Sequence, residues 1–366
     1  MRVLHVLAET GWSGGEVQLD FLVRHLVARG HANRLVLAPD AKFAATASAV
    51  GVPVDVVDLR RPLRVRVRRA FRAAVTAFAP DVLHFGCGRS LLWGGIHARG
   101  IRVPVRVTTR RIDYPIGRFW RGWRYRSLVD HVVANSIGVQ REVLAAGVAP
   151  DRVSLVHEGI DLAPWQGIRA DRAAARQRLG IAPDALLLAC AAALRPRKGQ
   201  RDLLHAFALL RPRFPQARLF LAGDGTDLAL LRRRAVALGI DAAVHIPGAV
   251  RPIRDLYAAA DVFCMPSFHE GLSNACLEAG AAGLPQVVSP AGGLPEIVAD
   301  GETGLVVRAG DPNAWSEALS ALLADPARRE RMGTAAAARV AALFPAQRMV
   351  ENMERLFERL LRDADG

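Results

Sequence analysis

Short apolar runs alternate along the chain with longer segments in which apolar residues recur at helical spacing. Each run ends in turn-forming residues, as buried parallel strands usually do. In the first half of the chain, strands are expected at residues 2–8, 35–38, 54–59, 82–85, 103–108 and 131–135. In the second half, strands are expected at residues 186–192, 219–222, 244–246, 262–265, 286–289 and 305–307.

The segments between most of these runs predict helices. Apolar residues from Val17 to Leu26 share one helical face, and Gly30 ends that helix. A second helix is expected around residues 203–210, and a last one at residues 347–361. Strands that alternate with helices predict an α/β fold built on parallel sheets.

The length of the chain indicates two domains, because 366 residues exceed the size at which one hydrophobic core stops growing. The strand–helix pattern restarts after a turn-rich segment near Pro164. We therefore expect a Rossmann-like domain at residues 1–165 and another at residues 166–344. A final helix at residues 345–366 is expected to pack back on the first domain. Two doubly wound domains in tandem predict a ligand in the cleft between them, at the carboxyl ends of the strands.

The composition is that of a globular protein, with 51% hydrophobic and 23% charged residues. No run approaches the ~20 apolar residues of a membrane-spanning helix. Glu9 interrupts the amino-terminal apolar run too early for an export signal. The four cysteines form no closely spaced pair, which excludes a sequence-local zinc site and favours buried thiols in a reducing compartment. A cytoplasmic protein is expected.

The positive charge is concentrated in the first part of the chain. Residues 1–150 hold 23 basic and 10 acidic side chains, whereas residues 151–366 hold 26 and 25. Arginines crowd residues 60–72, and residues 117–126 interleave arginines with aromatic residues. Two interpretations remain: docking to an anionic membrane surface, or a solvated basic helix with aromatic residues packed on the core. No nucleic-acid-binding motif accompanies the arginines, so nucleic acid is not an expected partner.

The segment after the strand at residues 262–265 carries the candidate chemistry. Ser273 or Asn274 can cap a helix that runs to about residue 282, and backbone N–H groups at such a helix start suit a phosphate. Glu270 precedes this helix, and Glu278 lies about one turn into it. A carboxylate pair beside a phosphate site suits a sugar nucleotide. Two glutamates at this spacing also arise by chance, so the surrounding sequence must decide whether they form a binding site.

The run PSFHEGLSNACLEAGAAGLPQVVSPAGGLPEIVADGETGL, at residues 266–305, resembles the donor-site signature of glycosyltransferase family 4. The similarity extends to SGGE at residues 13–16, to residues 129–161, and to the segments LRPRKGQRDLLHAFALL, LFLAGDG and ADPARRERMG. It spans most of the chain and is more specific in the second half. The resemblance implies a retaining enzyme with the two-domain GT-B fold.

The resemblance also implies roles for individual residues of the second half. Glu270 matches the family glutamate that contacts the transferred sugar near its reacting carbon, and Glu278 matches the one that binds the nucleotide ribose. Gly271, Leu272 and Ser273 would supply backbone donors to the sugar and diphosphate.

Further implied roles concern the diphosphate. Lys198, one of only two lysines in the chain, matches the residue that neutralises its charge. Gly14 and Gly15 match the loop that closes over the phosphates in the first domain. With these groups in place, no metal ion and no other cofactor is expected.

Two positions depart from the family pattern. Ala193 stands where an arginine usually accompanies the lysine, and Arg195 on the same loop is the candidate substitute. The first domain also lacks the usual histidine near the reacting sugar. Arg110, Arg111 and Asp113 are therefore the acceptor-side candidates, although surface charge explains each of them equally well.

The function implied is transfer of a sugar from a nucleoside-diphosphate-sugar to a hydroxyl of a lipid-linked or cell-surface glycan, such as a lipopolysaccharide or exopolysaccharide precursor. The protein would then work in the cytoplasm, docked at the inner face of the membrane. Two alternatives stay open. One is an epimerase of the same fold that acts on the sugar nucleotide alone, and the other is a non-catalytic, membrane-associated member of the fold.

Overall fold

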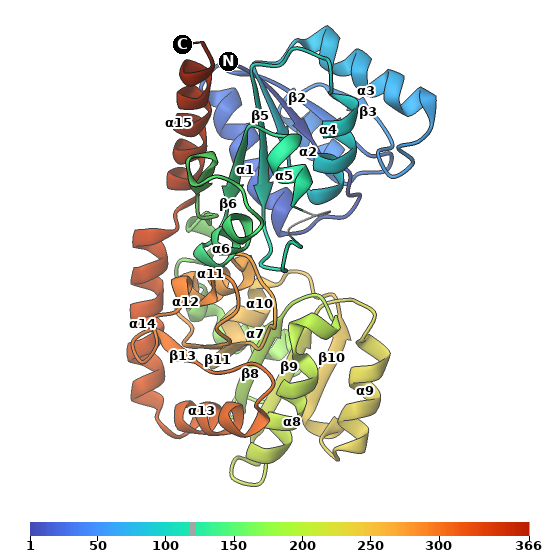
Figure 1. The fold of residues 1–366 in the computed structure, drawn as a ribbon. Coiled ribbons are helices and arrows are strands. Elements are labelled where there is room, and N and C mark those ends of the chain that lie inside the picture. The colour runs from blue at the N-terminus through green and yellow to red at the C-terminus, as the bar shows by residue number, and fades with distance from the viewer. Residues whose placement is uncertain (118–121, 366) are drawn as a thin grey trace. The chain divides into compact units, whose positions relative to one another are not determined.

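In the computed structural model, residues 1–117 and 122–365 are described, and they form two compact units (Figure 1). The first unit comprises Met1–Gly159 and Ala346–Gly366, and the second comprises Ile160–Pro345. The sequence placed the division at residue 165 instead. Residues 160–168 pack with the second unit, because Trp165 and Ile168 are buried in its core and the Ile160 N–H donates to the Phe344 carbonyl.

The first unit is built on a seven-stranded sheet in the order β3-β2-β1-β4-β5-β6-β7, with all pairs parallel. Its strands are β1 (Arg2–Val6), β2 (Ala32–Leu37), β3 (Val54–Val56), β4 (Val82–Phe85), β5 (Val105–Arg110), β6 (His131–Ala134) and β7 (Val153–Leu155). The sequence did not predict β7. This edge strand is three residues long with Ser154 at its centre, so it lacks the apolar run of a central strand.

Helices cover both faces of this sheet. They are α1 (Gly14–Ala28), α2 (Phe43–Ala49), α3 (Val65–Phe78), η1 (Ser90–Gly94), α4 (Gly95–His97), α5 (Trp123–Ser127), α6 (Ile137–Ala145), η2 (Pro150–Arg152) and the carboxyl-terminal α15 (Ala346–Asp365). Figure 1 shows α15 running alongside the first unit, where it packs against α1 and β5. The buried residues of α15 are the apolar Met349, Val350, Met353, Leu356 and Phe357 together with Glu354.

The second unit is built on a six-stranded parallel sheet in the order β10-β9-β8-β11-β12-β13. Its strands are β8 (Leu186–Ala191), β9 (Ala217–Ala222), β10 (Val244–Gly248), β11 (Val262–Met265), β12 (Gln286–Val288) and β13 (Gly304–Val306). Its main helices are α7 (Arg172–Leu179), α8 (Gln200–Leu210), α9 (Leu228–Ala237), α10 (Arg254–Ala259), α11 (Asn274–Ala281), α12 (Leu294–Ile297), α13 (Pro312–Ala324) and α14 (Pro326–Leu343). Short turns of helix are η3 (Ala163–Trp165), η4 (Ile168–Asp171), η5 (Pro196–Lys198) and η6 (Asp241–Ala243).

Each sheet is covered by a separate hydrophobic cluster on each face. In β8, for example, Leu187 and Ala189 belong to one cluster, whereas Leu188 and Cys190 belong to the other. Neighbouring side chains of a strand point to opposite faces, so this alternation identifies a doubly wound sheet. The predicted fold class is confirmed in both units.

Both strand orders reverse direction at one point, between β1 and β4 in the first unit and between β8 and β11 in the second. Doubly wound proteins bind ligands beyond the carboxyl ends of the strands at such a point. The loops that follow these strands are therefore where each unit is expected to hold a ligand.

Candidate functional site

A buried ion pair joins the loops that follow β8 and β11. The Lys198 ammonium donates to Oε1 of Glu270, and both side chains are buried. The Ser267 hydroxyl donates to the same oxygen over 2.8 Å. Two of the residues that the sequence singled out are thus brought together at the reversal point of the second sheet.

These two loops meet because the chain contains glycine where they touch. Gly199 has a φ of 70°, and a Cβ there would lie 2.0 Å from the Pro266 carbonyl oxygen. The contact is held by the Phe268 N–H, which donates to the Arg197 carbonyl over 2.8 Å, and by the Arg197 guanidinium, which donates to the His269 carbonyl. Only glycine permits so close a backbone approach at this φ.

A third loop, after β12, packs on the other side of Glu270. Gly292 has a φ of 52°, and a Cβ there would lie 2.3 Å from the Glu270 carbonyl oxygen. The Gly293 N–H donates to the Gly271 carbonyl over 2.7 Å, and the Ser289 hydroxyl donates to the Ser267 carbonyl. We call these segments, residues 192–199, 266–273 and 289–293, the donor loops.

Helix α11 begins directly after the second donor loop. Ser273 is its N-cap, and the Ser273 hydroxyl accepts from the Cys276 N–H over 3.4 Å, as the sequence predicted. The N–H groups of Gly271, Leu272 and Ser273 have no hydrogen-bond acceptor among the described residues. Unsatisfied donors at the positive end of a helix form a site for an anionic group such as a phosphate.

Glu278 lies on α11 beside a buried tyrosine. Its Oε2 accepts a hydrogen bond of 2.7 Å from the Tyr257 hydroxyl. Burial raises the pKa of Glu278 to about 7, while the hydrogen bond from Tyr257 acts in the opposite direction. The carboxylate is therefore held at a fixed place and titrates near neutral pH. Tyr257 itself was not among the predicted residues, because an isolated buried tyrosine in α10 carries no sequence signal.

The remaining second-unit candidates are less clearly placed. Arg195 is exposed on the same donor loop as Lys198, and its side chain makes no hydrogen bond to another described residue. Ala193 is exposed beside it. Cys190, Cys264 and Cys276 are buried as expected, and burial raises the pKa of the Cys190 thiol to about 12, whereas Cys87 in the first unit is only half-buried.

In the first unit, Gly14 and Gly15 form the first turn of α1 rather than a separate loop. Ser13 is the N-cap, and Glu16 Oε2 accepts from the Ser13 N–H over 2.8 Å and from its hydroxyl. A Cβ added at Gly15 would lie 3.6 Å from Cδ of Arg111. The glycine turn therefore faces one of the predicted acceptor-side residues.

Arg111 is the centre of a polar cluster at the carboxyl ends of the first-unit strands. Its Nε donates to Glu158 Oε1 over 2.6 Å, and one terminal nitrogen donates to the Gly86 carbonyl over 2.9 Å. Glu158 Oε2 accepts from the Asn135 side-chain amide over 3.1 Å. We call Gly15, Gly86, Arg111, Asn135 and Glu158 the Arg111 cluster.

The Arg111 cluster contains two groups that the sequence did not identify. Burial raises the pKa of the Glu158 carboxyl, against the opposing influence of Arg111 and Asn135. The side-chain carbonyl oxygen of Asn135 is buried without a hydrogen-bond donor among the described residues. A buried acceptor without a partner is unfavourable unless a ligand or water completes it. Glu158 follows β7, so missing that strand also concealed this carboxylate.

The other two acceptor-side candidates lie apart from this cluster. Arg110 ends β5 and is buried, where it donates to the Tyr125 hydroxyl over 2.7 Å and to the Tyr114 carbonyl over 2.5 Å. These contacts give Arg110 a role within the fold. Asp113 is half-buried on the following loop.

A chain of buried histidines supports Thr109, the residue before Arg110. The His84 ring bonds to the Thr109 hydroxyl over 2.8 Å and to His5 over 3.0 Å, and His5 bonds to Asn33. Burial lowers the pKa of His5 to about 4 and that of His84 well below its usual value. Burial thus disfavours the charged form of both rings, which are fully buried within the first unit.

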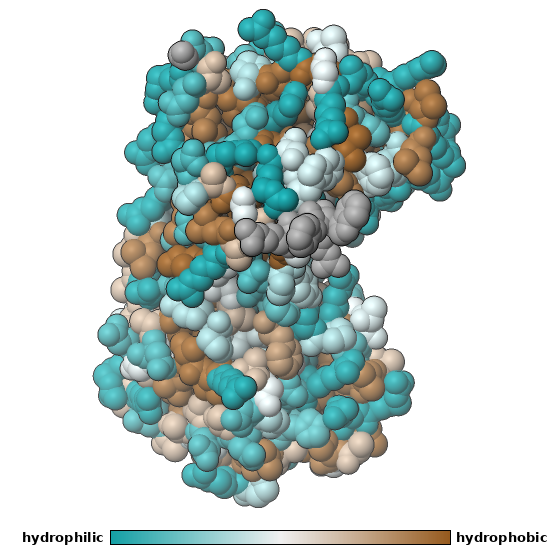
Figure 2. Space-filling view, in the orientation of Figure 1, coloured by the Kyte–Doolittle hydropathy of each residue, from teal (hydrophilic) through white to brown (hydrophobic). Residues whose placement is uncertain are grey.

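Helix α3 carries most of the first arginine cluster. Arg64, Arg66, Arg68 and Arg69 are exposed, and Leu63 and Val65 beside them are 85% and 64% exposed. Figure 2 shows hydrophilic and hydrophobic residues side by side over this helix. In the second predicted cluster, residues 118–121 lie outside the described part of the chain. Within the described residues, no helix is both long and apolar enough to cross a membrane.

Two family models match successive parts of the chain. One, described as Glycosyltransferase Family 4, matches residues 12–164, and the other, described as Glycosyl transferases group 1, matches residues 171–339. Together they span nearly all of both units.

Curated relatives are similar over part of their length. A D-inositol 3-phosphate glycosyltransferase of Corynebacterium efficiens is 36% identical over 222 residues, which cover 57% of this chain and 52% of that protein. The protein of the same name from Streptomyces avermitilis is also 36% identical, over 57% of this chain and 47% of its own length. The chain thus spans about half the length of these relatives.

Solved structures share the whole fold. HepE of Anabaena, solved in complex with UDP, has a TM-score of 0.85 at 22% identity, covering 98% of this chain and 100% of HepE. Sucrose-phosphate synthase of Thermosynechococcus elongatus has a TM-score of 0.82 at 21% identity, covering 99% of this chain and all of that one. These structures show that the chain has the GT-B fold, and the two family models, which together span most of its length, show that it belongs to glycosyltransferase family 4.

Proposed function

We propose that this protein transfers a sugar from a nucleoside-diphosphate-sugar to an acceptor hydroxyl with retention and without a metal ion. The observation that carries the proposal is the Lys198–Glu270 pair beside the unsatisfied N–H groups of residues 271–273. A cation and a set of backbone donors suit a diphosphate, while an adjacent carboxylate suits sugar hydroxyls.

Each donor-loop group would act on a different part of the donor. Lys198 and the α11 amides would stabilise the charge that develops on the departing diphosphate, which is the work a metal ion does in other enzymes. Glu270 would accept hydrogen bonds from the sugar and set its orientation. Glu278 would accept hydrogen bonds from the ribose. Arg195 would take the place of the arginine that the family usually has at the position of Ala193. The acceptor hydroxyl would attack on the face that the diphosphate leaves, so that the anomeric configuration is retained.

We propose UDP-glucose as the first donor to test. HepE, whose fold this chain shares, has been solved with UDP and with UDP-glucose. A thermal-shift series with UDP-, GDP-, ADP- and CDP-sugars would identify the nucleotide. A rise in melting temperature with UDP-sugars alone supports the proposal, and no rise with any of the four classes contradicts it.

For the acceptor, we propose a lipid-linked or cell-surface glycan. The support is the α3 surface, defined as Leu63, Arg64, Val65, Arg66, Arg68 and Arg69. Its arginines surround the positive end of α3, and no acidic residue lies in the first turn, so an anionic surface would offset the charge. Flotation with anionic and neutral vesicles tests this part. Binding to anionic vesicles alone supports it, and binding to neither contradicts it.

A phosphorylated polyol is the second candidate acceptor, because the curated relatives are named D-inositol 3-phosphate glycosyltransferases. The guanidinium of Arg111 and the open side-chain carbonyl of Asn135 would then contact the acceptor. Product analysis with UDP-glucose and each acceptor class in turn distinguishes a glycan acceptor from a phosphorylated polyol. The same reactions with and without EDTA test whether a metal ion is needed. Proton NMR of the product reports its anomeric configuration. An inverted linkage, or transfer that EDTA abolishes, would contradict the mechanism proposed.

A further inference from the structure

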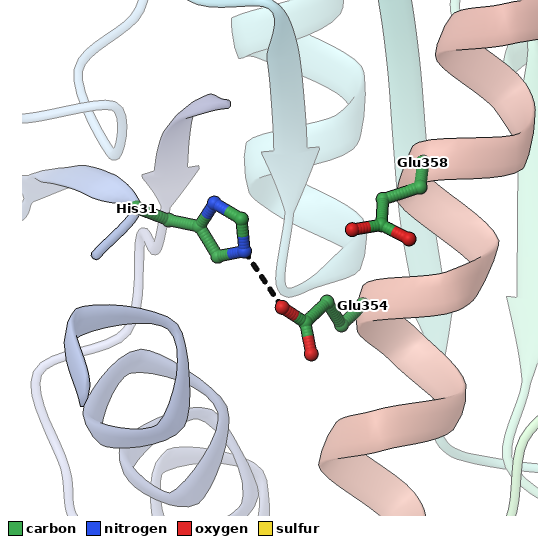
Figure 3. A group of neighbouring side chains, drawn as sticks. All are labelled: His31, Glu354 and Glu358. Carbon is green, nitrogen blue, oxygen red and sulfur yellow. Dashed lines mark hydrogen bonds and ion pairs between the residues drawn. The ribbon is translucent and has the colours of Figure 1, made fainter. Parts of the chain in front are cut away.

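A group of imidazoles and carboxylates joins α15 to the rest of the first unit. His31 Nε2 lies 2.7 Å from Glu354 Oε1, and His25 Nε2 lies 2.9 Å from Glu354 Oε2. Glu358 follows one helical turn later on the same face of α15. Figure 3 shows the side chains of Glu354 and Glu358 turned toward the His31 ring.

The cluster brings three possible metal ligands together at one point. One ligand atom each from His31, Glu354 and Glu358 lies within 4.8 Å of the others. Glu358 has no hydrogen bond or ion pair to any described residue, although its carboxylate is only half-exposed. Arg29 contacts Glu354 at 3.3 Å, but its side chain is 64% exposed and does not contact Glu358. A cation shared by Glu354 and Glu358 would give the Glu358 carboxylate an electrostatic partner.

The ligand types indicate which cation fits. Imidazole nitrogen together with carboxylate oxygen suits zinc and neighbouring transition metals, whereas calcium and magnesium prefer oxygen ligands alone. Zinc bonds to nitrogen and oxygen are about 2.0–2.2 Å long, so its ligand atoms lie about 3.3 Å apart. The ligand atoms of His31, Glu354 and Glu358 lie within 4.8 Å of one another, so an ion would have to draw them only a little closer, and His25 lies beside the group through its contact with Glu354.

We propose that His31, Glu354 and Glu358, with His25 beside them, form a zinc-type metal site that fastens α15 to the first unit. His31 lies just before β2, at the amino ends of the strands, whereas the Arg111 cluster lies at their carboxyl ends. The site is therefore structural and separate from the groups assigned to sugar transfer. Metal-independent transfer is unaffected by it.

The test is metal binding by the full chain, prepared without a polyhistidine tag and treated with chelator. Zn²⁺ is expected to raise the melting temperature by about 3 °C or more at saturation, because a ligand that binds only the folded state stabilises it. Co²⁺, used as a spectroscopic probe, is expected to give visible absorption bands at a stoichiometry of one per chain.

Two variants and one control locate the site. Glu358→Gln removes a ligand that has no protein partner, so the chain should fold normally while its Zn²⁺ affinity falls at least tenfold. His31→Gln should have the same effect on affinity. Asp363→Asn removes an exposed carboxylate from the same helix and should leave binding unchanged. Absence of Zn²⁺ binding to the wild-type chain, or equal binding by wild type and Glu358→Gln, would overturn the proposal in favour of a simple His–Glu ion-pair cluster.

Discussion

Each unit pairs a basic with an acidic side chain at the carboxyl ends of its strands, yet the two pairs are built differently. Lys198 and Glu270 follow β8 and β11, the two strands that flank the reversal of the second sheet. Arg111 and Glu158 follow β5 and β7, and Arg111 is only half-buried. The Arg111 guanidinium reaches toward the reversal of the first sheet, where it donates to the Gly86 carbonyl after β4. Only the Lys198 pair is supplied by the two strands that flank a reversal, where doubly wound sheets bind ligands.

The two cations also differ in how many of their donors are engaged. Lys198 carries three N–H donors on a flexible stem and contacts one protein carboxylate. Arg111 has a rigid planar group that is directed at Glu158 and at the Gly86 carbonyl. Lys198 can therefore exchange Glu270 for a diphosphate, whereas Arg111 is better suited to fix the shape of its surroundings. The following variants test this difference.

Glu270→Ala should have the largest effect. Loss of the carboxylate that orients the sugar is expected to lower kcat/KM by about 10³-fold. UDP affinity should stay the same or rise, because Lys198 loses its only competing carboxylate. Activity is measured as product release and affinity by calorimetry. Glu302→Ala, which alters an exposed turn of the same unit, is the matched control. Near-normal transfer by Glu270→Ala would show that its assigned role is wrong.

Lys198→Met should weaken transfer by about 10²-fold and UDP binding by about tenfold or more, because the diphosphate loses its cation. The change also leaves the buried Glu270 carboxylate without its cation, which should lower the free energy of unfolding by about 3 kcal/mol.

The double variant Lys198→Met/Glu270→Gln separates these two effects. It should recover most of the lost stability, since the unpaired charge is gone, but none of the UDP affinity. Recovery of UDP binding would show that Lys198 acts on the fold and not on the donor. Chemical denaturation and calorimetry on the same preparations give both quantities.

Glu158→Gln should affect the acceptor more than the donor. Removing the charge that pairs with Arg111 is expected to lower the free energy of unfolding by about 3 kcal/mol and to raise the acceptor KM by about tenfold. UDP affinity should be unchanged. An equal loss of UDP affinity in Glu158→Gln and Lys198→Met would abolish the contrast between the two pairs.

The same contrast shows how far sequence reasoning reaches. The second unit was predictable because its strands are apolar runs and its functional groups lie in one continuous segment, from Pro266 to Glu278. Lys198 was found through the family resemblance, since no local pattern links it to Glu270. The glycines at 199 and 292, which bring the donor loops together, act through long-range backbone contacts that sequence spacing does not reveal.

In the first unit, a single missed strand hid the carboxylate of the Arg111 cluster. The edge strand β7 is short and contains Ser154, so the hydrophobic pattern predicted no strand there. Glu158 was therefore not recognised as a residue that follows the end of a strand. The strand β5 was expected to end at residue 108, which left Arg110 and Arg111 looking equivalent. The structure extends β5 to Arg110 and turns that side chain toward Tyr125, whereas Arg111 meets Gly15 and Glu158. Which of two neighbouring arginines faces a site depends on the last residue of a strand, a boundary that periodicity defines poorly.

The smallest expected effect concerns pH. Because burial raises the pKa of Glu278 from 4.5 to about 7, the folded chain holds this proton at pH values where the unfolded chain has released it. The contribution of Glu278 to the stability of the folded chain is complete below about pH 4.5 and is lost as the pH rises to about 7. Ionisation also makes Glu278 a stronger acceptor for ribose hydroxyls, so UDP affinity should rise several-fold between about pH 6 and 8. In Glu278→Gln, UDP affinity should not rise over this pH range, whereas in the control Glu302→Gln the rise should remain. If the pH dependence persists in Glu278→Gln, the titrating group is elsewhere and the carboxylate on α11 is only a packing partner of Tyr257.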